Sequence, residues 1–170
     1  YKRQVMQIQF VQAPTLKQKP ADESKLGFGR IFTDYMFVME YTEGQGWHDP
    51  RIVPYGPIEL DPAAMCLHYG QEAFEGLKAY RCPDGKVRVF RPEENAARLQ
   101  STCRGIVMPE LPTDLFVEMV EKVVRLNQDF IPPYESGATL YLRPLLVGTS
   151  AQVGVHEGQD YLFLILSLIH

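Results

Sequence analysis

Residues 67–80, LHYGQEAFEGLKAY, follow neither the helical nor the strand period throughout. Residues 71–74 suit one helical turn, whereas the run after Gly76 alternates like a short strand. Tyr69 stands at the preceding corner with a hydroxyl that can hydrogen-bond, and a glycine permits close approach of a backbone or ligand. Local departures from periodicity are typical of functional sites, although a plain glycine-rich connection with a half-buried tyrosine would look the same. We therefore predict a turn that leads into a strand, with a candidate site at the turn.

Hairpin signals flank this stretch on both sides. Upstream, residues 33–41 and 51–53 are strand-like and are joined by a glycine-rich turn. Downstream, residues 77–80 and 87–90 flank Cys82-Pro83-Asp84-Gly85. In that tetrapeptide the proline sets a turn φ, the aspartate caps the turn and the glycine tolerates a positive φ. The sequence thus predicts two antiparallel hairpins.

Two helices are predicted between the hairpins and the C-terminal part. Pro92 fits the first position of a helix, and acidic residues that complement the helix dipole follow it. Its apolar stripe is formed by Ala96, Leu99, Cys103 and Ile106. Arg98 lies outside this stripe, on a polar edge. A second helix is expected to begin with Thr113 as its cap and to end at Pro132-Pro133.

The C-terminal part is strand-like. Residues 139–147 alternate, so Tyr141 and Arg143 point the same way, and Pro144 demands either a bulge or a sheet edge. Residues 161–168 are almost continuously apolar, as expected of a strand covered on both faces. With a largely extended lead-in over residues 1–26, the elements predict an α+β fold: a mostly antiparallel sheet with two helices packed against it.

Composition excludes several classes of protein. The 170 residues carry a formal net charge of -4 and no basic stripe, which disfavours a nucleic-acid partner. The three cysteines show no C-x-x-C spacing, which fits a reducing, cytoplasmic setting better than a disulfide framework or a zinc knuckle. No signal peptide or membrane-spanning run is visible. Because the chain begins with Tyr1, we expect it to be a portion of a longer protein.

Few residues suggest chemistry by themselves. Arg143 on an apolar strand needs an anionic partner, and an internal salt bridge and a ligand carboxylate explain it equally well. Arg98 fits a solvated helix residue, and Lys78 fits a surface residue of a strand. The histidines lack metal-ligand spacing, so no zinc site is predicted. Neither a Ser-His-Asp arrangement nor a phosphate-binding G-x-x-x-x-G-K motif is present.

Four co-linear segments, however, resemble the branched-chain amino acid aminotransferases, pyridoxal-phosphate enzymes of fold type IV. They are FGRIFTDYM (28–36), LHYGQEAFEGLKAY (67–80), VFRPEENAARL (89–99) and YLRPLLVG (141–148). The resemblance covers about residues 26 to 168. It implies a transferase of branched-chain amino acid biosynthesis, a cytoplasmic homodimer that moves the amino group of leucine, isoleucine or valine to 2-oxoglutarate.

The resemblance also implies roles for individual residues. Arg98 is similar to the arginine that binds the cofactor phosphate in the family. Phe28, Tyr69 and Tyr141 resemble walls of the substrate side-chain pocket, and Arg143 resembles the arginine that accepts the second carboxylate of glutamate. Val155 resembles a pocket residue that, together with Tyr69, comes from the neighbouring subunit of a dimer.

The chain departs from the family pattern in one respect. The Schiff-base lysine matches none of Lys78, Lys86 and Lys122, so no catalytic residue is assigned and that lysine is expected in a C-terminal cofactor domain beyond this chain. Residues 27–168 would then be the N-terminal small domain, inactive alone. Two alternatives stay open: another fold type IV enzyme, such as a D-amino acid aminotransferase or aminodeoxychorismate lyase, and a non-catalytic dimerisation module.

Overall fold

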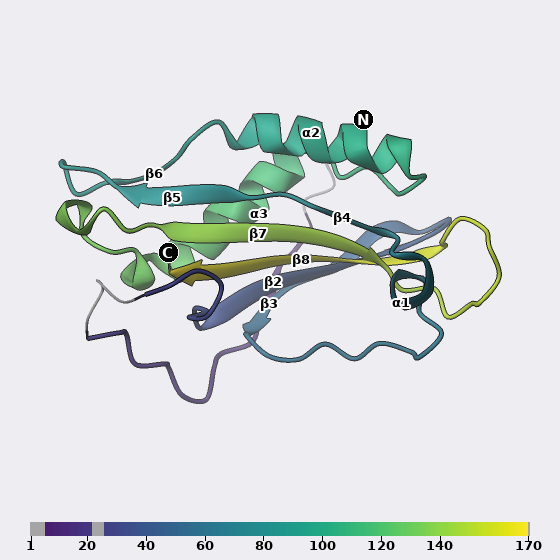
Figure 1. Cartoon of the computed structure of the whole chain (residues 1–170), viewed down its shortest axis with the longest axis horizontal. Coiled ribbons are helices and arrows are strands. Elements are labelled where there is room, and N and C mark those ends of the chain that lie inside the picture. Colours follow the sequence, from purple (N-terminus) through teal and green to yellow (C-terminus); the bar gives the residue numbers. More distant parts are fainter. Residues whose placement is uncertain (1–5, 22–25, 170) are drawn as a thin grey trace.

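The computed structural model describes residues 6–21 and 26–169, and a curved sheet with helices over one face dominates them (Figure 1). The eight strands have the order β1-β3-β2-β8-β7-β5-β6, and β4 also pairs with β7. The strands are β1 Gln9–Phe10, β2 Tyr35–Thr42, β3 Gly46–Pro54, β4 Glu72–Phe74, β5 Leu77–Arg81, β6 Val87–Val89, β7 Leu140–Gly148 and β8 Asp160–Ile169. Only the β1–β3 pairing is parallel within the described residues. The predicted α+β fold with a mostly antiparallel sheet is confirmed.

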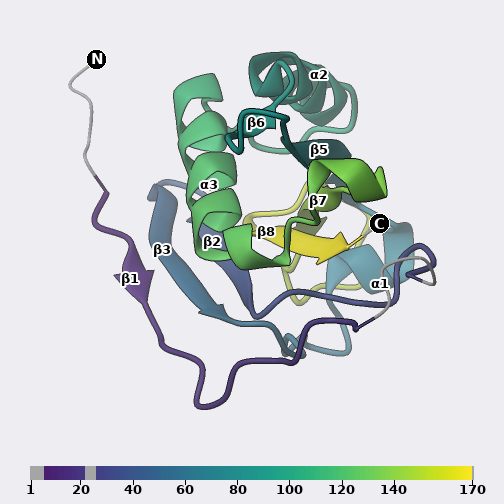
Figure 2. The same ribbon diagram turned by 90° about the vertical axis from the view of Figure 1, so that its left-hand side faces the viewer.

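Two long helices lie side by side on one face of the sheet (Figure 2). They are α2, Pro92–Gly105, and α3, Thr113–Leu126; the short helix α1, Met65–Tyr69, lies at one end of the sheet. Two 3-10 turns, Gln128–Phe130 and Tyr134–Ser136, connect α3 to β7. The other face of the sheet carries no helix of the length of α2 or α3 in the part that the structure describes (Figure 2). We call it the open face.

The core lies between the sheet and helices α2 and α3. Its largest fully buried side chains are Phe37, Phe116, Phe163, Met39, Leu99, Leu111, Met119, Leu140, Leu142, Leu146, Ile165 and Val120. Each such side chain contributes about 1.5–3 kcal/mol through removal from water. In β7 the even-numbered residues enter this core and the odd-numbered ones face the open side, as the alternation predicts. Strand β8 is fully covered on its core side, whereas on the open face Leu164 is buried and Leu162 and Leu166 are only partly buried, so the predicted cover on both faces holds in part.

The helix boundaries correct three details of the sequence interpretation. Helix α2 begins at Pro92 as predicted, but Ile106 lies past its end and is 40% exposed, so the apolar stripe ends at Cys103. Thr113 is the first residue of α3 and makes no side-chain cap. Helix α3 ends at Leu126, well before the prolines. The buried amide of Asn127 ends it by donating to the carbonyls of Val123 and Tyr35.

The helical turn predicted for residues 71–74 is wrong. Helix α1 lies just before them and stops at Gly70, whose φ of 61° is left-handed. Residues 72–74 form β4 instead, with Ala73 in the core and Phe74 on the open face. Pairing with β7 decides the conformation, because it satisfies the backbone groups and gives Ala73 a buried position that a single turn of helix would not.

Pro144 requires neither a bulge nor a sheet edge. Strands β4 and β5 pair with β7 in one continuous register that places Glu75 opposite Pro144 and Gly76 opposite Arg143. The amide of Glu75 donates to the carbonyl of Pro144 at 2.9 Å. Pro144 has no N–H group, so the second hydrogen bond of this pair, to the carbonyl of Glu75, is absent. The strand ladder is therefore interrupted at Glu75-Gly76, but its register does not change.

The first residues add an edge to the sheet. Val5 lies outside the described residues, and the predicted peripheral strand is reduced to β1 at the edge beside β3. Residues 11–21 form no helix or strand, and Lys17 holds this segment against the sheet. Its Nζ donates to the carbonyls of Phe32 and Thr33, at 3.2 and 2.7 Å.

Candidate functional site

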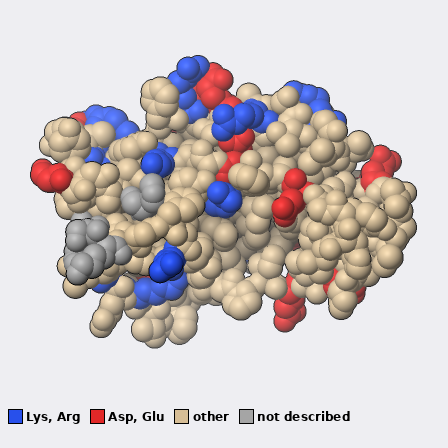
Figure 3. Space-filling model, in the orientation of Figure 1, with Lys and Arg blue, Asp and Glu red and all other residues tan. Residues whose placement is uncertain are grey.

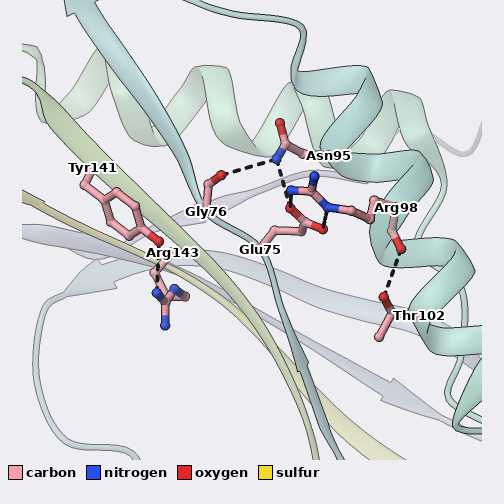
Figure 4. A network of polar contacts seen from close by, with 7 residues as sticks. All are labelled: Glu75, Gly76, Asn95, Arg98, Thr102, Tyr141 and Arg143. Atoms are coloured by element: carbon pink, nitrogen blue, oxygen red, sulfur yellow. Dashed lines mark hydrogen bonds and ion pairs between the residues drawn. The ribbon is translucent and has the colours of Figure 1, made fainter.

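The Glu75-Gly76 interruption lies between two polar groups, one on each face of the sheet (Figure 4). Glu75 points to the helix side, where α2 brings Asn95 and Arg98 to it. Gly76 lies on the open side, opposite Arg143 and beside Tyr141. The alternation of the strand therefore sends two neighbouring residues to two different sets of partners.

On the helix side, Arg98 and Glu75 form a bidentate pair. Nε of Arg98 donates to Oε1 at 2.8 Å and Nη2 donates to Oε2 at 2.6 Å, and Nδ2 of Asn95 donates to Oε2 at 2.9 Å. The Glu75 side chain is only 3% exposed, whereas that of Arg98 is 67% exposed. The hydrogen bonds that Arg98 donates to Glu75, and then the negative charge of Glu75, raise the pKa of Arg98 above its ordinary value. The guanidinium is thus permanently charged and oriented, with its outer edge in solvent.

The exposed edge of the Arg98 guanidinium suits one contact with a phosphate. Of the five N–H groups of a guanidinium, two are used by Glu75, and the others remain for an anion on the exposed side. The fit concerns Arg98 alone, because a complete phosphate site needs more donors than one guanidinium provides. The arginine expected from the sequence to be a solvated helix residue is therefore exposed but anchored to a buried carboxylate.

On the open face, Arg143 lies among aromatic rings. Its Nη2 donates to the hydroxyl of Tyr141 at 2.9 Å, and its guanidinium carbon lies 4.4 Å from the ring centroid of Phe74. The ring of Phe28 meets that of Tyr141 edge-on, with centroids 5.2 Å apart. No ion pair joins Arg143 to a carboxylate within residues 6–21 and 26–169, and its buried Nε has no hydrogen-bond partner there. The internal salt bridge, one of the two explanations open at the sequence level, is not found there.

Tyr69 and Val155 belong to a third group at the end of the sheet. The Tyr69 hydroxyl donates to the carbonyl of Val153, which ties the end of α1 to the loop between β7 and β8. The hydroxyl of Ser150 accepts from the amides of Gln159 and Asp160, at 2.8 Å each, and closes the base of this loop. Val155 is 89% exposed at the loop's outer side. The structure thus brings Tyr69 close to the loop that carries Val155.

Relatives named as branched-chain aminotransferases match most of the chain. It is 50% identical over 141 residues to the "Probable branched-chain-amino-acid aminotransferase" of Streptomyces coelicolor, which covers 83% of this chain and 39% of the relative. It is 50% identical over 150 residues to "Branched-chain-amino-acid transaminase 1" of Bacillus subtilis, covering 88% and 42%. The chain is a homologue of the N-terminal part of branched-chain aminotransferases. It spans about two fifths of the length of these relatives.

Solved aminotransferase structures share the fold. A branched-chain amino acid aminotransferase of Escherichia coli superposes with a TM-score of 0.59 at 22% identity, over 78% of this chain and 39% of that one. The enzyme of the thermophilic archaeon Thermoproteus uzoniensis, solved with norvaline, gives 0.59 at 20% identity, over 78% and 40%. A further branched-chain aminotransferase, complexed with N-(5'-phosphopyridoxyl)-L-glutamate, gives 0.58 at 21% identity over the same shares. These matches identify the fold as that of the small domain of fold type IV branched-chain aminotransferases. No family model matches the chain.

Two residues of this aminotransferase homologue were missed at the sequence level. Local periodicity favours a helical turn for Phe74 and gives no indication of its place beneath Arg143. Glu75 carries a usable signal, since it is a carboxylate between the apolar residues Phe74 and Leu77 that shares the alternation of Ala73 and Leu77, and it therefore needs a partner if buried. Its partner Arg98 lies 23 residues away in sequence.

Other polar groups of the aminotransferase homologue have simpler explanations. Lys78 is half-buried rather than a plain surface residue, and its strand position faces Tyr141 across β5 and β7. Glu40, His48 and Asp49 hold ligand atoms within 4.8 Å of one another, but Arg51 already pairs with Glu40 at 2.7 Å and supplies a cation there.

Basic and acidic side chains are interspersed on the face seen in Figure 3. None of the described helices is long and apolar enough to cross a membrane.

Proposed function

We propose that the complete protein is a branched-chain amino acid aminotransferase, which transfers the amino group of leucine, isoleucine or valine to 2-oxoglutarate with pyridoxal 5'-phosphate. The relatives of 45–50% identity, all aminotransferases of this specificity by name, support the reaction. One observation of the structure carries the proposal: Arg143 is a cation without a carboxylate partner among the described residues, held by Tyr141 and set against aromatic rings.

That arrangement suits a site that must accept two different side chains in turn. The rings of Phe28, Phe74 and Tyr141 offer apolar walls to the aliphatic side chain of leucine, isoleucine or valine. The guanidinium of Arg143 offers two donors to the second carboxylate of glutamate or 2-oxoglutarate. Tyr141 orients the Arg143 guanidinium through its hydroxyl, so that the donors are in place for the carboxylate while the aromatic walls receive the aliphatic side chain.

Pyridoxal phosphate, when bound, supplies the electron sink that stabilises negative charge at the amino acid Cα. In this proposal Arg98 holds the phosphate through its outward N–H groups. The lysine that anchors the cofactor belongs to a C-terminal domain outside this chain, and residues 27–168 are the small domain. The greater length of the relatives supports this division.

Subunit sharing completes the proposed site. Tyr69 and Val155 would reach the pocket of the neighbouring subunit of a homodimer, from the end of the sheet where α1 and the β7–β8 loop meet. The high exposure of Val155 supports a role in contact with another surface. We place the enzyme in the cytoplasm and in branched-chain amino acid biosynthesis.

The test is a transamination assay on the full-length protein. Purified protein with pyridoxal phosphate should form glutamate from leucine and 2-oxoglutarate, and omission of leucine is the control. Failure to form glutamate from leucine, isoleucine or valine would contradict the proposal. Residues 1–170 expressed alone should form none under the same conditions.

A further inference from the structure

Glu75 is a buried charge with an unusual number of donors around it. Its carboxylate receives three hydrogen bonds, two from Arg98 and one from Asn95, at 2.6–2.9 Å. Nδ2 of Asn95 also donates to the carbonyl of Gly76 at 3.3 Å, which holds the strand and α2 together at this point (Figure 4). A carboxylate that is 3% exposed is costly to bury, and these three bonds offset the cost.

The cationic partner is, by contrast, mostly in solvent. An exposed arginine on a helix samples many rotamers, and ordering it costs conformational entropy. The fork from Nε and Nη2 to Glu75 fixes the plane of the Arg98 guanidinium. It also leaves Nη1 and the outer hydrogen of Nη2 as the donors that an incoming anion can meet.

We infer that Glu75 is a positioning residue that holds Arg98 with its Nη1–Nη2 edge toward the phosphate of the cofactor. This inference rests on the proposed function and adds to it the residue that sets the geometry of the phosphate contact. Glu75 itself touches no phosphate, because Arg98 lies between its carboxylate and solvent.

Two opposing effects of Glu75 on the phosphate can be separated. Its negative charge repels the phosphate across the width of the guanidinium. On charge alone, a protein with a neutral residue at position 75 would therefore bind the cofactor more tightly. Glutamine at residue 75, however, would point its own NH2 group at an Arg98 donor, and the guanidinium would turn away. We expect orientation to outweigh repulsion, because the repulsion acts toward a solvent-exposed edge where water screens it.

The experiment measures cofactor affinity of the complete apoenzyme rather than activity. Protein fluorescence is titrated with pyridoxal phosphate and, separately, with pyridoxal, which lacks the phosphate. Glu75→Gln should weaken the binding of pyridoxal phosphate about tenfold, as expected for loss of a charge-assisted hydrogen bond. It should change the affinity for pyridoxal less than about twofold. Glu94→Gln is the matched control, since Glu94 is an exposed acid of the same helix that pairs with Arg91. It should change neither affinity.

A double-mutant cycle identifies the route of the effect. In an Arg98→Ala background, Glu75→Gln should no longer alter the affinity for pyridoxal phosphate. If Glu75→Gln does not fold, Glu75→Asp, which keeps the charge but shortens the reach, takes its place with the same expected selectivity for the phosphorylated ligand. Equal weakening of both ligands, tighter binding of pyridoxal phosphate, or no change would each overturn the inference.

The two proposals fail in different ways. Wild-type protein that does not bind pyridoxal phosphate contradicts the proposed function itself. Loss of binding in Arg98→Ala together with full binding in Glu75→Gln leaves the proposed function standing and contradicts only the role of Glu75.

Discussion

Gly76 lies so close to the hydroxyl of Tyr141 that a Cβ atom at residue 76 would overlap it. Gly76 stands opposite Arg143 in the strand register, and Tyr141 leans across the space that a side chain there would fill. In that position the hydroxyl accepts the hydrogen bond from Nη2 of Arg143 at 2.9 Å. The missing side chain of residue 76 is thus a condition for the Tyr141–Arg143 pair.

Replacement of Gly76 by alanine should therefore disturb the carboxylate contact selectively. The added methyl displaces the Tyr141 hydroxyl and breaks its bond to Arg143, so we expect KM for 2-oxoglutarate to rise about tenfold. KM for 4-methyl-2-oxopentanoate should rise less, and steady-state kinetics of the full-length enzyme measures both. Gly105→Ala is the control, because a Cβ at Gly105 meets nothing within 4 Å. Equal changes for the two substrates would argue against the arrangement.

Removal of the Arg143 guanidinium tests the same pocket from the other side. Arg143→Ala should lower kcat/KM for 2-oxoglutarate by about 10- to 100-fold, the loss expected for a charge-assisted hydrogen bond. The loss for 4-methyl-2-oxopentanoate should be much smaller, since its side chain carries no charge. Arg125→Ala, on the exposed side of α3, is the control. A uniform loss would mean that Arg143 supports the pocket without contacting the carboxylate.

Subunit sharing can be tested with mixed dimers. In every mixed dimer one subunit has its cofactor lysine inactivated, so each dimer retains one active lysine. In one arrangement Tyr69→Phe lies in the subunit with the active lysine, and in the other it lies in the subunit with the inactivated lysine. If Tyr69 serves its neighbour's pocket, the activity per active lysine in a transamination assay should differ between these two arrangements. Identical activities would reject sharing.

Asn127 should be important for stability. Its buried amide accepts from the amide of Tyr35 at 3.2 Å and donates to the carbonyls of Tyr35 and Val123, which links the end of α3 to β2. Asn127→Ala leaves these backbone groups unpaired and should lower the free energy of unfolding by about 2–3 kcal/mol. Urea unfolding followed by circular dichroism measures the change. Gln128→Ala, at an exposed neighbouring position, should have little effect, and a similar loss there would refute the specific link.

Cys103 should be chemically silent in the folded protein. It is fully buried in the core, and desolvation raises the pKa of its thiol to about 11. On the order of one thiol in a thousand would be ionised at pH 8, and the reactive species is the thiolate. Iodoacetamide at pH 8 should therefore label Cys82, which is partly exposed, well before Cys103. Peptide mass spectrometry gives the order, and labelling of both after unfolding in urea is the control.

Much of the fold follows from local sequence signals. The glycine-rich turn before β3, the Pro-Asp-Gly turn between β5 and β6, and the start of α2 at Pro92 are found where they were predicted. Alternation placed Tyr141 and Arg143 on one face, and the structure adds the hydrogen bond between them. These predictions succeeded because turn chemistry and side-chain period depend on neighbouring residues only.

Two of the wrong predictions have the same cause, which is pairing with distant residues. Residues 72–74 are a strand because β7 lies beside them, and α3 ends at Leu126 because Asn127 reaches the backbone of Tyr35. Neither partner can be recognised from local periodicity. Likewise, local periodicity indicates only a solvated residue at Arg98, because the carboxylate that orients it comes from another element.

The sequence by itself determined the two hairpins, the two long helices and the two C-terminal strands, and it carries the resemblance to the branched-chain aminotransferases. Only the tertiary structure decided that Glu75 is buried beneath Arg98 and that Gly76 makes room for the Tyr141 hydroxyl. Local preferences act through the backbone of adjacent residues, and a sequence displays them directly. The cost of a buried charge and the overlap of two side chains depend on which residues folding brings together, and this is why the site needed the structure.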